Sequence, residues 1–139
     1  MTTRQVPPTR ERTSRIGVRP VDEVETAYRK LTAEATRTAR AARAGSSTGR
    51  AHDRVLEPFE AVSEGAADAY RWALARAARG PVTGAPTGDV PDLSRLTAEA
   101  DAAAVLLDDP VCPPDRRAYV RGVHDALAWL CGQSDEHAV

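Results

Sequence analysis

The chain has 139 residues, of which 42% are hydrophobic and 28% charged, so it is long enough for one domain with its own core. Aromatic residues make up only 4%, while 26 residues are alanine, and this composition favours closely packed helices over a sheet. No run approaches the roughly 18 apolar residues of a membrane span, and no apolar stretch of signal-peptide length opens the sequence. We therefore expect a cytoplasmic protein with no membrane association.

Charge is unevenly distributed along the chain. Residues 1–50 hold 11 basic and 5 acidic residues, or +6, and residues 51–139 hold 8 basic and 15 acidic residues, or −7. Such asymmetry indicates either a nucleic-acid-facing end or head-to-tail attraction within the protein. Arginine supplies 18 of the 19 basic residues, a bias typical of GC-rich coding, which suggests an actinobacterial chromosome, a phage or a mobile element.

The first 19 residues carry five arginines, one glutamate and two adjacent prolines, with few large apolar residues. Such a segment cannot bury enough surface to offset the entropy lost on ordering. We expect a disordered basic tail over 1–19, which is either an arm for nucleic acid or a partner, or a plain flexible terminus. A flexible C-terminus is expected over 134–139.

Four helices are predicted in a single helical domain over 20–133. In chain order they span about 20–45, 51–79, 92–108 and 113–130, each with apolar residues at three- and four-residue spacing. Pro58 either starts the main body of the second helix or kinks it, and Gly80 followed by Pro81 should end that helix. No useful stretch alternates with period two, so we expect no sheet.

Two short motifs repeat along the chain. The sequence LTAEA at 31–35 recurs at 96–100, and the pattern G-x-x-D-A-x-x-W at 65–72 recurs at 122–129. The second pattern contains both tryptophans of the chain, each at the same distance from a glycine and an aspartate. We predict two similar helical hairpins, over 20–80 and 91–132, that close into an all-α four-helix bundle with approximate two-fold symmetry.

The repeated pattern also supplies the candidate partner-binding residues. In each copy the glycine and the tryptophan share a helix face that is displaced from the main apolar stripe. Glycine lets another backbone approach, and tryptophan offers a large contact area. Two interpretations remain open, a wide core and a surface seam for a homodimer or partner protein. The residues concerned are Gly65, Asp68, Trp72, Gly122, Asp125 and Trp129.

No residue pattern in the sequence indicates catalysis or metal binding. Histidine is scarce, and Cys112 and Cys131 stand at the two ends of the fourth predicted helix. At 1.5 Å per residue they lie roughly 25 Å apart, which is too far to share a metal ion or a disulfide. We expect no enzyme activity, no cofactor and no metal.

A second class of function rests on arginine. Residues 41–47 resemble the turn of a helix-turn-helix, although Arg40 and Arg54 stand where that motif places apolar residues. The candidate nucleic-acid-binding residues are Arg37, Arg40, Arg43, Arg50 and Arg54. We therefore predict a small non-enzymatic helical protein-interaction module that associates with itself or with a partner protein. The alternative is a DNA-associated regulator that uses the Arg-rich segment 4–54.

Overall fold

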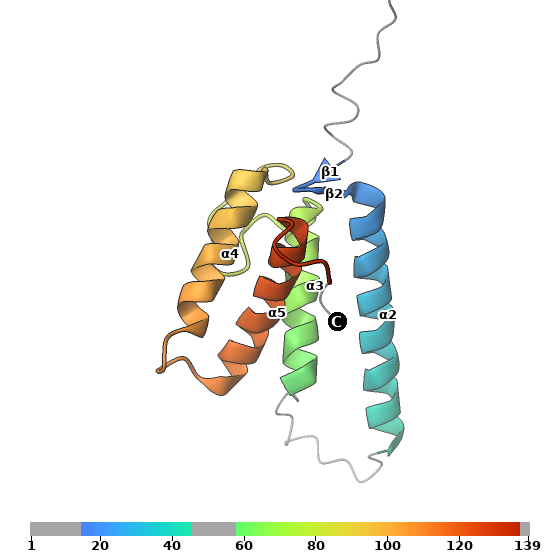
Figure 1. The fold of residues 1–139 in the computed structure, drawn as a ribbon. Coiled ribbons are helices and arrows are strands. Elements are labelled where there is room, and N and C mark those ends of the chain that lie inside the picture. The colour runs from blue at the N-terminus through green and yellow to red at the C-terminus, as the bar shows by residue number, and fades with distance from the viewer. Residues whose placement is uncertain (1–14, 46–57, 137–139) are drawn as a thin grey trace, which may run out of the picture.

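The computed structural model describes residues 15–45 and 58–136. Four helices dominate it, and a small antiparallel ribbon precedes them (Figure 1). Within these ranges no helix is long and apolar enough to cross a membrane. The elements are β1 (Arg15–Ile16), β2 (Arg19–Pro20), α2 (Val21–Gly45), α3 (Pro58–Ala73), α4 (Leu93–Leu107) and α5 (Pro114–Leu130). The prediction of a mostly helical chain is confirmed.

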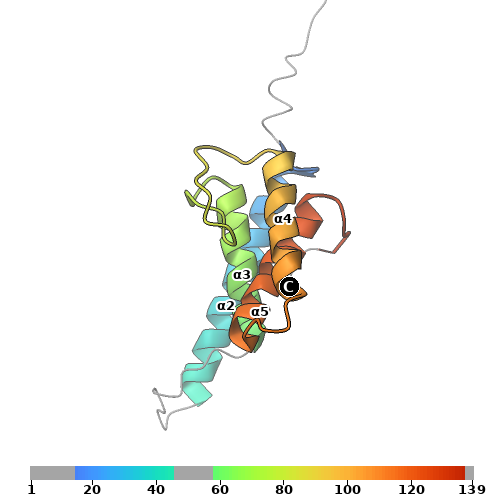
Figure 2. The same cartoon turned by 90° about the vertical axis from the view of Figure 1, so that its left-hand side faces the viewer.

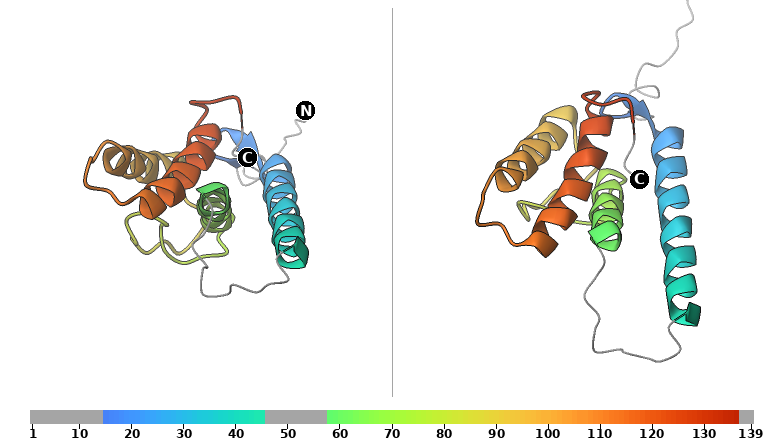
Figure 3. Two further views of the ribbon diagram at one scale, coloured as in Figure 1. Left: turned by 90° about the horizontal axis from the view of Figure 1, so that it is seen from below. Right: turned by 60° about the horizontal axis from the view of Figure 1, so that its bottom comes forward.

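The helices lie side by side in the order α4, α5, α3, α2 (Figures 1 and 3). The two middle helices, α3 and α5, make the most extensive contact, while α4 packs on α5 and α2 packs on α3. A closed four-helix bundle would also need close packing of α2 on α4. In the described part of the chain each helix instead packs mainly on its neighbours in this row.

Local sequence explains where the third and fourth helices begin. The Asp92 side chain caps α4 by accepting a hydrogen bond from the backbone N–H of Arg95 at 2.9 Å. Pro114 occupies the first position of α5, where its missing N–H costs nothing. Both helices keep close to their predicted bounds, as α2 does.

The predicted end of the second helix, by contrast, is wrong. In the structure α3 ends at Ala73, because Ala75 adopts the left-handed conformation with φ +63°. The N–H of Ala75 bonds to the Trp72 carbonyl at 3.0 Å, and that of Arg76 bonds to the Arg71 carbonyl at 2.8 Å. This is the Schellman arrangement of a helix C-terminus, here with alanine at the position that glycine usually holds. The predicted first turns over 51–57 lie outside the described residues.

The end of α5 has the same hydrogen bonds at the offset of the sequence repeat. The N–H of Gly132 bonds to the Trp129 carbonyl at 3.1 Å, and that of Gln133 bonds to the Ala128 carbonyl at 2.8 Å. Gly132 has φ +81°. It stands 57 residues after Ala75, as Trp129 stands 57 residues after Trp72.

A two-stranded ribbon replaces part of the predicted disordered tail, so the expectation of no sheet is wrong. The ribbon turns at Gly17, which has φ +63°, a conformation that favours glycine in a two-residue hairpin loop. Ile16 is only 1% exposed and belongs to the core, and the N–H of Val18 bonds to the Leu130 carbonyl at 2.9 Å. One buried isoleucine and bonds to the end of α5 anchor residues 15–19. The rest of the predicted tail, 1–14, lies outside the described residues.

The left-handed residues at the ends of α3 and α5 predict opposite changes in stability for Ala75→Gly and Gly132→Ala. Ala75→Gly should raise the free energy of unfolding by about 1 kcal/mol, because glycine adopts a positive φ without the steric cost that alanine pays. Gly132→Ala should lower it by about the same amount for the same reason. Thermal unfolding followed by circular dichroism measures both changes. Shifts of the same sign in the two variants would contradict this account of the helix ends.

Candidate functional site

The two glycines of the repeated motif lie where α3 crosses α5. A Cβ atom built on Gly65 would stand 2.0 Å from the carbonyl oxygen of Tyr119, three residues before Gly122. A Cβ atom built on Gly122 would stand 1.9 Å from the carbonyl oxygen of Val62, three residues before Gly65. The contacts are therefore reciprocal, and each helix backbone rests on the other where no side chain intervenes.

The two aspartates of the motif differ in their surroundings. Asp68 lies on α3 beside the crossing, where its Oδ2 accepts a hydrogen bond from the Tyr119 hydroxyl at 2.6 Å. Its Oδ1 also pairs with the guanidinium of Arg71. The side chain of Asp125 on α5 is 46% exposed, and its Oδ1 lies 3.7 Å from Nδ1 of the adjacent His124. Only Asp68 joins the two middle helices.

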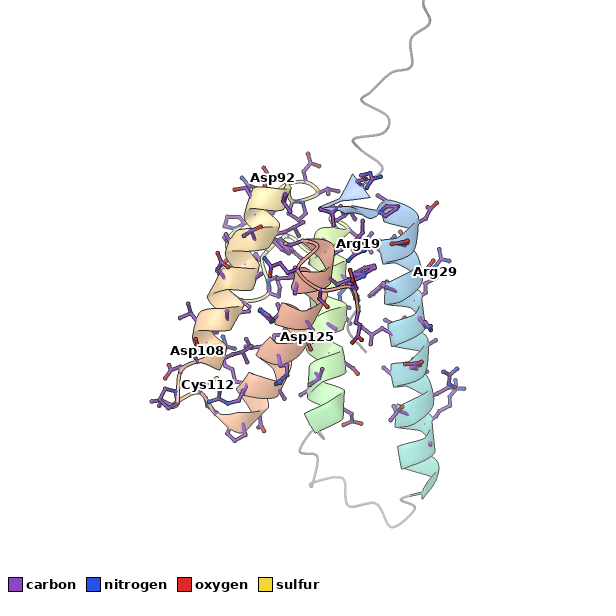
Figure 4. All side chains as sticks on the ribbon, in the orientation of Figure 1. Arg19, Arg29, Asp92, Asp108, Cys112 and Asp125 are labelled. Atoms are coloured by element: carbon purple, nitrogen blue, oxygen red, sulfur yellow. The ribbon has the colours of Figure 1, made fainter. Side chains whose placement is uncertain are left out.

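Both tryptophans are buried, at 2% exposure for Trp72 and 5% for Trp129. The loop after α3 covers Trp72, whose indole N–H donates to the Thr87 hydroxyl at 3.2 Å. This loop folds back beside the end of α3 (Figure 2). The ribbon covers Trp129, where the Arg19 guanidinium lies 4.8 Å from the ring centroid and its Nε donates to the Trp129 carbonyl at 2.8 Å. Figure 4 shows Arg19 in this position, near the end of α5.

The structure therefore brings most of the candidate partner-binding residues into the interior of a single chain. Both glycines are buried at the crossing, and both indoles lie in the core, as the wide-core interpretation expects. Trp129 also lines an open pocket of about 460 Å³, together with Arg19 and Asp135. The assignment of the six residues to a partner stays a prediction.

Sequence reasoning missed one buried carboxylate, Glu99 of α4, which is 4% exposed. It accepts hydrogen bonds from the backbone N–H groups of Val82 at 2.8 Å and Thr83 at 3.2 Å, and from the Thr83 hydroxyl. Gly80 leaves room for it, since a Cβ there would lie 2.3 Å from the carboxylate. The interaction fixes the loop that covers Trp72. Glu99 belongs to the LTAEA repeat, and the recurrence of this motif is the one feature of the sequence that singles out Glu99.

The packing of α2 changes along its length. Its first half is held against α3, with Val24 and Leu31 buried and Glu25 paired with Arg76 at the end of α3. Beyond Leu31 no described side chain of α2 is buried, and Ala35 is exposed. This second half extends past the beginning of α3 (Figures 1 and 2).

An open cleft lies between this second half of α2 and α3. Its volume is about 270 Å³, below the roughly 300–1,000 Å³ typical of small-molecule sites. Leu31, Ala35 and Ala67 contribute apolar surface, while Glu60 and Glu64 contribute carboxylates. The remaining lining residues are Thr32, Thr38, Ser63 and Arg71. The cleft suits a row of side chains from another helix better than an enclosed ligand.

The arginines assigned to nucleic acid are only partly described. Arg37 and Arg40 are exposed on the second half of α2. The side chains of Arg43, Arg50 and Arg54 lie outside the described residues. Of the segment that resembles a helix-turn-helix turn, residues 41–45 belong to α2, and residues 46–47 are not described. Those assignments stay predictions.

Cys112 and Cys131 stand at opposite ends of α5, and both are free thiols. Figure 4 shows Cys112 in the turn between α4 and α5. Burial raises the pKa of the Cys131 thiol, whose sulfur lies 3.7 Å from the Thr97 hydroxyl. Over 15–45 and 58–136, no three His, Cys, Asp or Glu side chains lie close enough together to hold a metal ion.

Comparisons with protein-family models, curated proteins and solved structures found no match to this chain. The surfaces of the molecule are therefore the basis for assigning its function. Among the described surfaces, the cleft between α2 and α3 combines an apolar floor, charged walls and an exposed helix face.

The close crossing at Gly65 and Gly122 predicts that alanine at these positions lowers stability, whereas helix propensity predicts that it raises stability. Alanine normally stabilises a helix interior by about 1 kcal/mol over glycine. Gly65→Ala and Gly122→Ala should each instead lower the free energy of unfolding by about 2 kcal/mol or more, because the new Cβ forces the two backbones apart. Gly88→Ala is the matched control, because a Cβ there meets nothing within 4 Å. Urea unfolding measures all three, and a stabilised Gly65→Ala variant would refute the close crossing.

The bond between Tyr119 and Asp68 predicts a loss of stability at high pH. Burial and the hydrogen bond to Asp68 raise the pKa of Tyr119 above its ordinary value of 10.0. The folded protein therefore keeps a proton that the unfolded chain releases, so this stabilisation is complete below about pH 10 and falls as the pH rises further. Tyr119→Phe should lower stability by about 1 kcal/mol at neutral pH and reduce the alkaline loss.

Melting curves of the Tyr119→Phe variant between neutral pH and pH values above about 10 test this coupling. Tyr28→Phe is the control, because it leaves the Tyr119 bond in place and should keep the alkaline loss. An equal alkaline loss in Tyr119→Phe and the wild type would show that another group causes it.

Proposed function

We propose that this protein is a non-enzymatic helical module that acts by binding another protein chain through the second half of α2 and its cleft with α3. The observation that carries the proposal is the exposure of Ala35, on the same side of α2 as the buried Leu31. An apolar helix face that its own chain leaves uncovered is typical of a surface that a partner helix covers.

Comparison of the two copies of the LTAEA motif supports this proposal. Leu31 on α2 and Leu96 on α4 are both buried, at 4% and 0% exposure. One turn later Ala100 of α4 is 2% exposed against α5, whereas its counterpart Ala35 of α2 is exposed. The same face is therefore covered in one helix and open in the other. We infer that a partner covers it in α2.

The proposal of a duplicated hairpin, with approximate two-fold symmetry, strengthens this comparison. The reciprocal contacts of Gly65 and Gly122 support such an axis, and so do the matching ends of α3 and α5. The segment before each outer helix also covers the tryptophan of the other half: the ribbon before α2 covers Trp129, and the loop before α4 covers Trp72. If the two halves are duplicates, the exposed face of α2 around Ala35 differs from the covered face of α4 around Ala100.

A DNA-associated role is the second candidate, and one observation favours it. Residues 35–45 of α2 carry three arginines and no acidic residue, and two of these side chains, Arg37 and Arg40, are exposed. The adjacent cleft presents the carboxylate of Glu64 on α3, which would repel a phosphate backbone. The mixed charge of this region favours a protein partner.

A bulky charge on the open face should abolish binding. Ala35→Glu should remove a protein that the wild-type chain retains from a lysate of the source cells, with at least about a tenfold loss in the amount retained, because a buried unpaired carboxylate is costly. Ala98→Glu on α4 is the matched control, since Ala98 is exposed and the change of charge is identical.

Both variants should melt within a few degrees of the wild type, because both positions are solvent-exposed. Equal retention of every protein by the Ala35→Glu and Ala98→Glu variants would reject this face as a binding surface. A bound nuclease-sensitive nucleic acid, lost on Arg37→Glu, would favour the second candidate instead.

A further inference from the structure

The side of α2 that is turned away from the cleft is basic. We define the outer face of α2 by five exposed residues, Arg29, Lys30, Ala33, Arg37 and Arg40. At about 100° per residue, these residues lie within about 100° of one another around the helix. Four of the five carry a positive charge, and the fifth is small. The outer face contains no large apolar side chain.

The charges of the outer face are almost free of ion pairs within the chain. Among the described residues only Arg29 has an ion-pair partner, Glu25 at 3.9 Å, and Arg76 also binds this carboxylate. Glu34 lies about 100° further round the helix than Ala33, beyond the edge of the face. Asp22 is on the same side, but it stands about two turns before Arg29. An incoming ligand therefore meets a net positive charge.

The outer face is also open to a long, rigid ligand. The helix α2 stands at the end of the row of helices, and its second half extends past the beginning of α3 (Figures 1 and 3). Figure 4 shows Arg29 pointing away from α3. From Arg29 to Arg40 the face is about 16 Å long at 1.5 Å per residue, which matches roughly five base pairs of a duplex.

This composition fits the phosphate backbone of DNA better than the surface of a protein. Protein interfaces depend on apolar and aromatic residues at their centre, and the outer face offers only Ala33. Phosphate binding needs cations alone, because each neutralised phosphate releases counterions. The second half of α2 is also slim, and the major groove of B-form DNA, about 12 Å wide, admits a helix, whereas that of an RNA duplex is too narrow.

We propose that the outer face of α2 binds duplex DNA, with its cations on the phosphates that border the major groove. This inference goes beyond the proposed function, because the outer face and the cleft are different surfaces. Ala35 of the cleft and Arg37 of the outer face are about 160° apart around the helix. Glu64 lines the cleft, so its carboxylate does not belong to the outer face. A protein and DNA can then bind to the two sides of α2 together.

The salt dependence of binding tests the proposal. Fluorescence anisotropy measures binding of the full chain to a labelled DNA duplex of about 20 base pairs over a range of salt concentrations. The slope of log K against log salt should become shallower by about 2 in a variant with Arg37→Gln and Arg40→Gln, since each phosphate contact contributes about 0.9. Binding by this variant at low salt should weaken by about tenfold or more.

The matched control carries Arg95→Gln and Arg121→Gln, which remove the same charge from exposed positions on α4 and α5. It should keep the slope of the wild type. All these changes are at exposed positions, so both variants should melt within a few degrees of the wild type. A wild type that binds no DNA at low salt, or an equal loss of slope in both variants, would overturn the proposal.

Two further probes separate DNA from other polyanions. An RNA duplex of the same sequence should bind more weakly than DNA, because its major groove does not admit the helix. Equal binding of the RNA duplex would contradict the placement in the major groove. Stronger binding of polyglutamate than of DNA would assign the outer face to an acidic protein instead, and this too would overturn the proposal.

Ala35→Glu distinguishes this inference from the proposed function. The change is on the cleft side of α2, so DNA binding should stay within about threefold of the wild type. DNA binding that depends on Arg37 and Arg40, with equal retention of proteins by Ala35→Glu and Ala98→Glu, would keep the DNA site and reject the proposed function. A wild type that binds no DNA, but retains a protein lost on Ala35→Glu, would do the reverse.

Discussion

The close crossing of α3 and α5 is the constraint on which the other contacts depend. Gly65 and Gly122 each leave the space that a backbone carbonyl of the other helix fills, at 2.0 and 1.9 Å from where a Cβ would stand. This proximity brings Tyr119 within hydrogen-bonding distance of Asp68. It also places the ends of α3 and α5 together, where the ring of Tyr70 meets that of Trp129 edge-on at a centroid distance of 6.2 Å. The outer helices then pack on an inner pair that is already fixed.

Non-helical segments complete the core because the helices alone leave the indoles at its edge. Trp72 gains its cover because α3 ends early, at Ala73, which frees the chain to fold back and place Thr87 beside the indole. Trp129 gains its cover from Arg19, which binds the end of α5 through its guanidinium. The Thr87 hydroxyl accepts a hydrogen bond from the indole N–H of Trp72, and buried indoles commonly find such a partner. The Arg19 guanidinium instead lies over the ring of Trp129.

Sequence periodicity and turn residues predicted three of the four helices closely, since Asp92, Pro114 and Gly45 mark ends by local chemistry alone. The repeated spacing of glycine and tryptophan singled out the residues of the crossing, but left open whether the indoles face a partner or the core. The ribbon escaped prediction because Ile16 is a lone apolar residue among arginines, and its burial depends on the distant carbonyl of Leu130. The bonds of Glu99 and the left-handed Ala75 are likewise tertiary effects, which override local propensity.

Because α2 stands at the end of the row of helices, one half of it is packed against the core while the other half is exposed. Its first half is fixed by Val24, Leu31 and the ribbon, whereas its second half has only α3 as a neighbour among the described elements. Alanine, threonine and arginine keep this half helical without apolar bulk, so it can remain exposed in the free chain at little cost. Because the side chains of this second half are small, only a backbone that approaches closely can cover it. The arginines beside them favour an acidic partner surface.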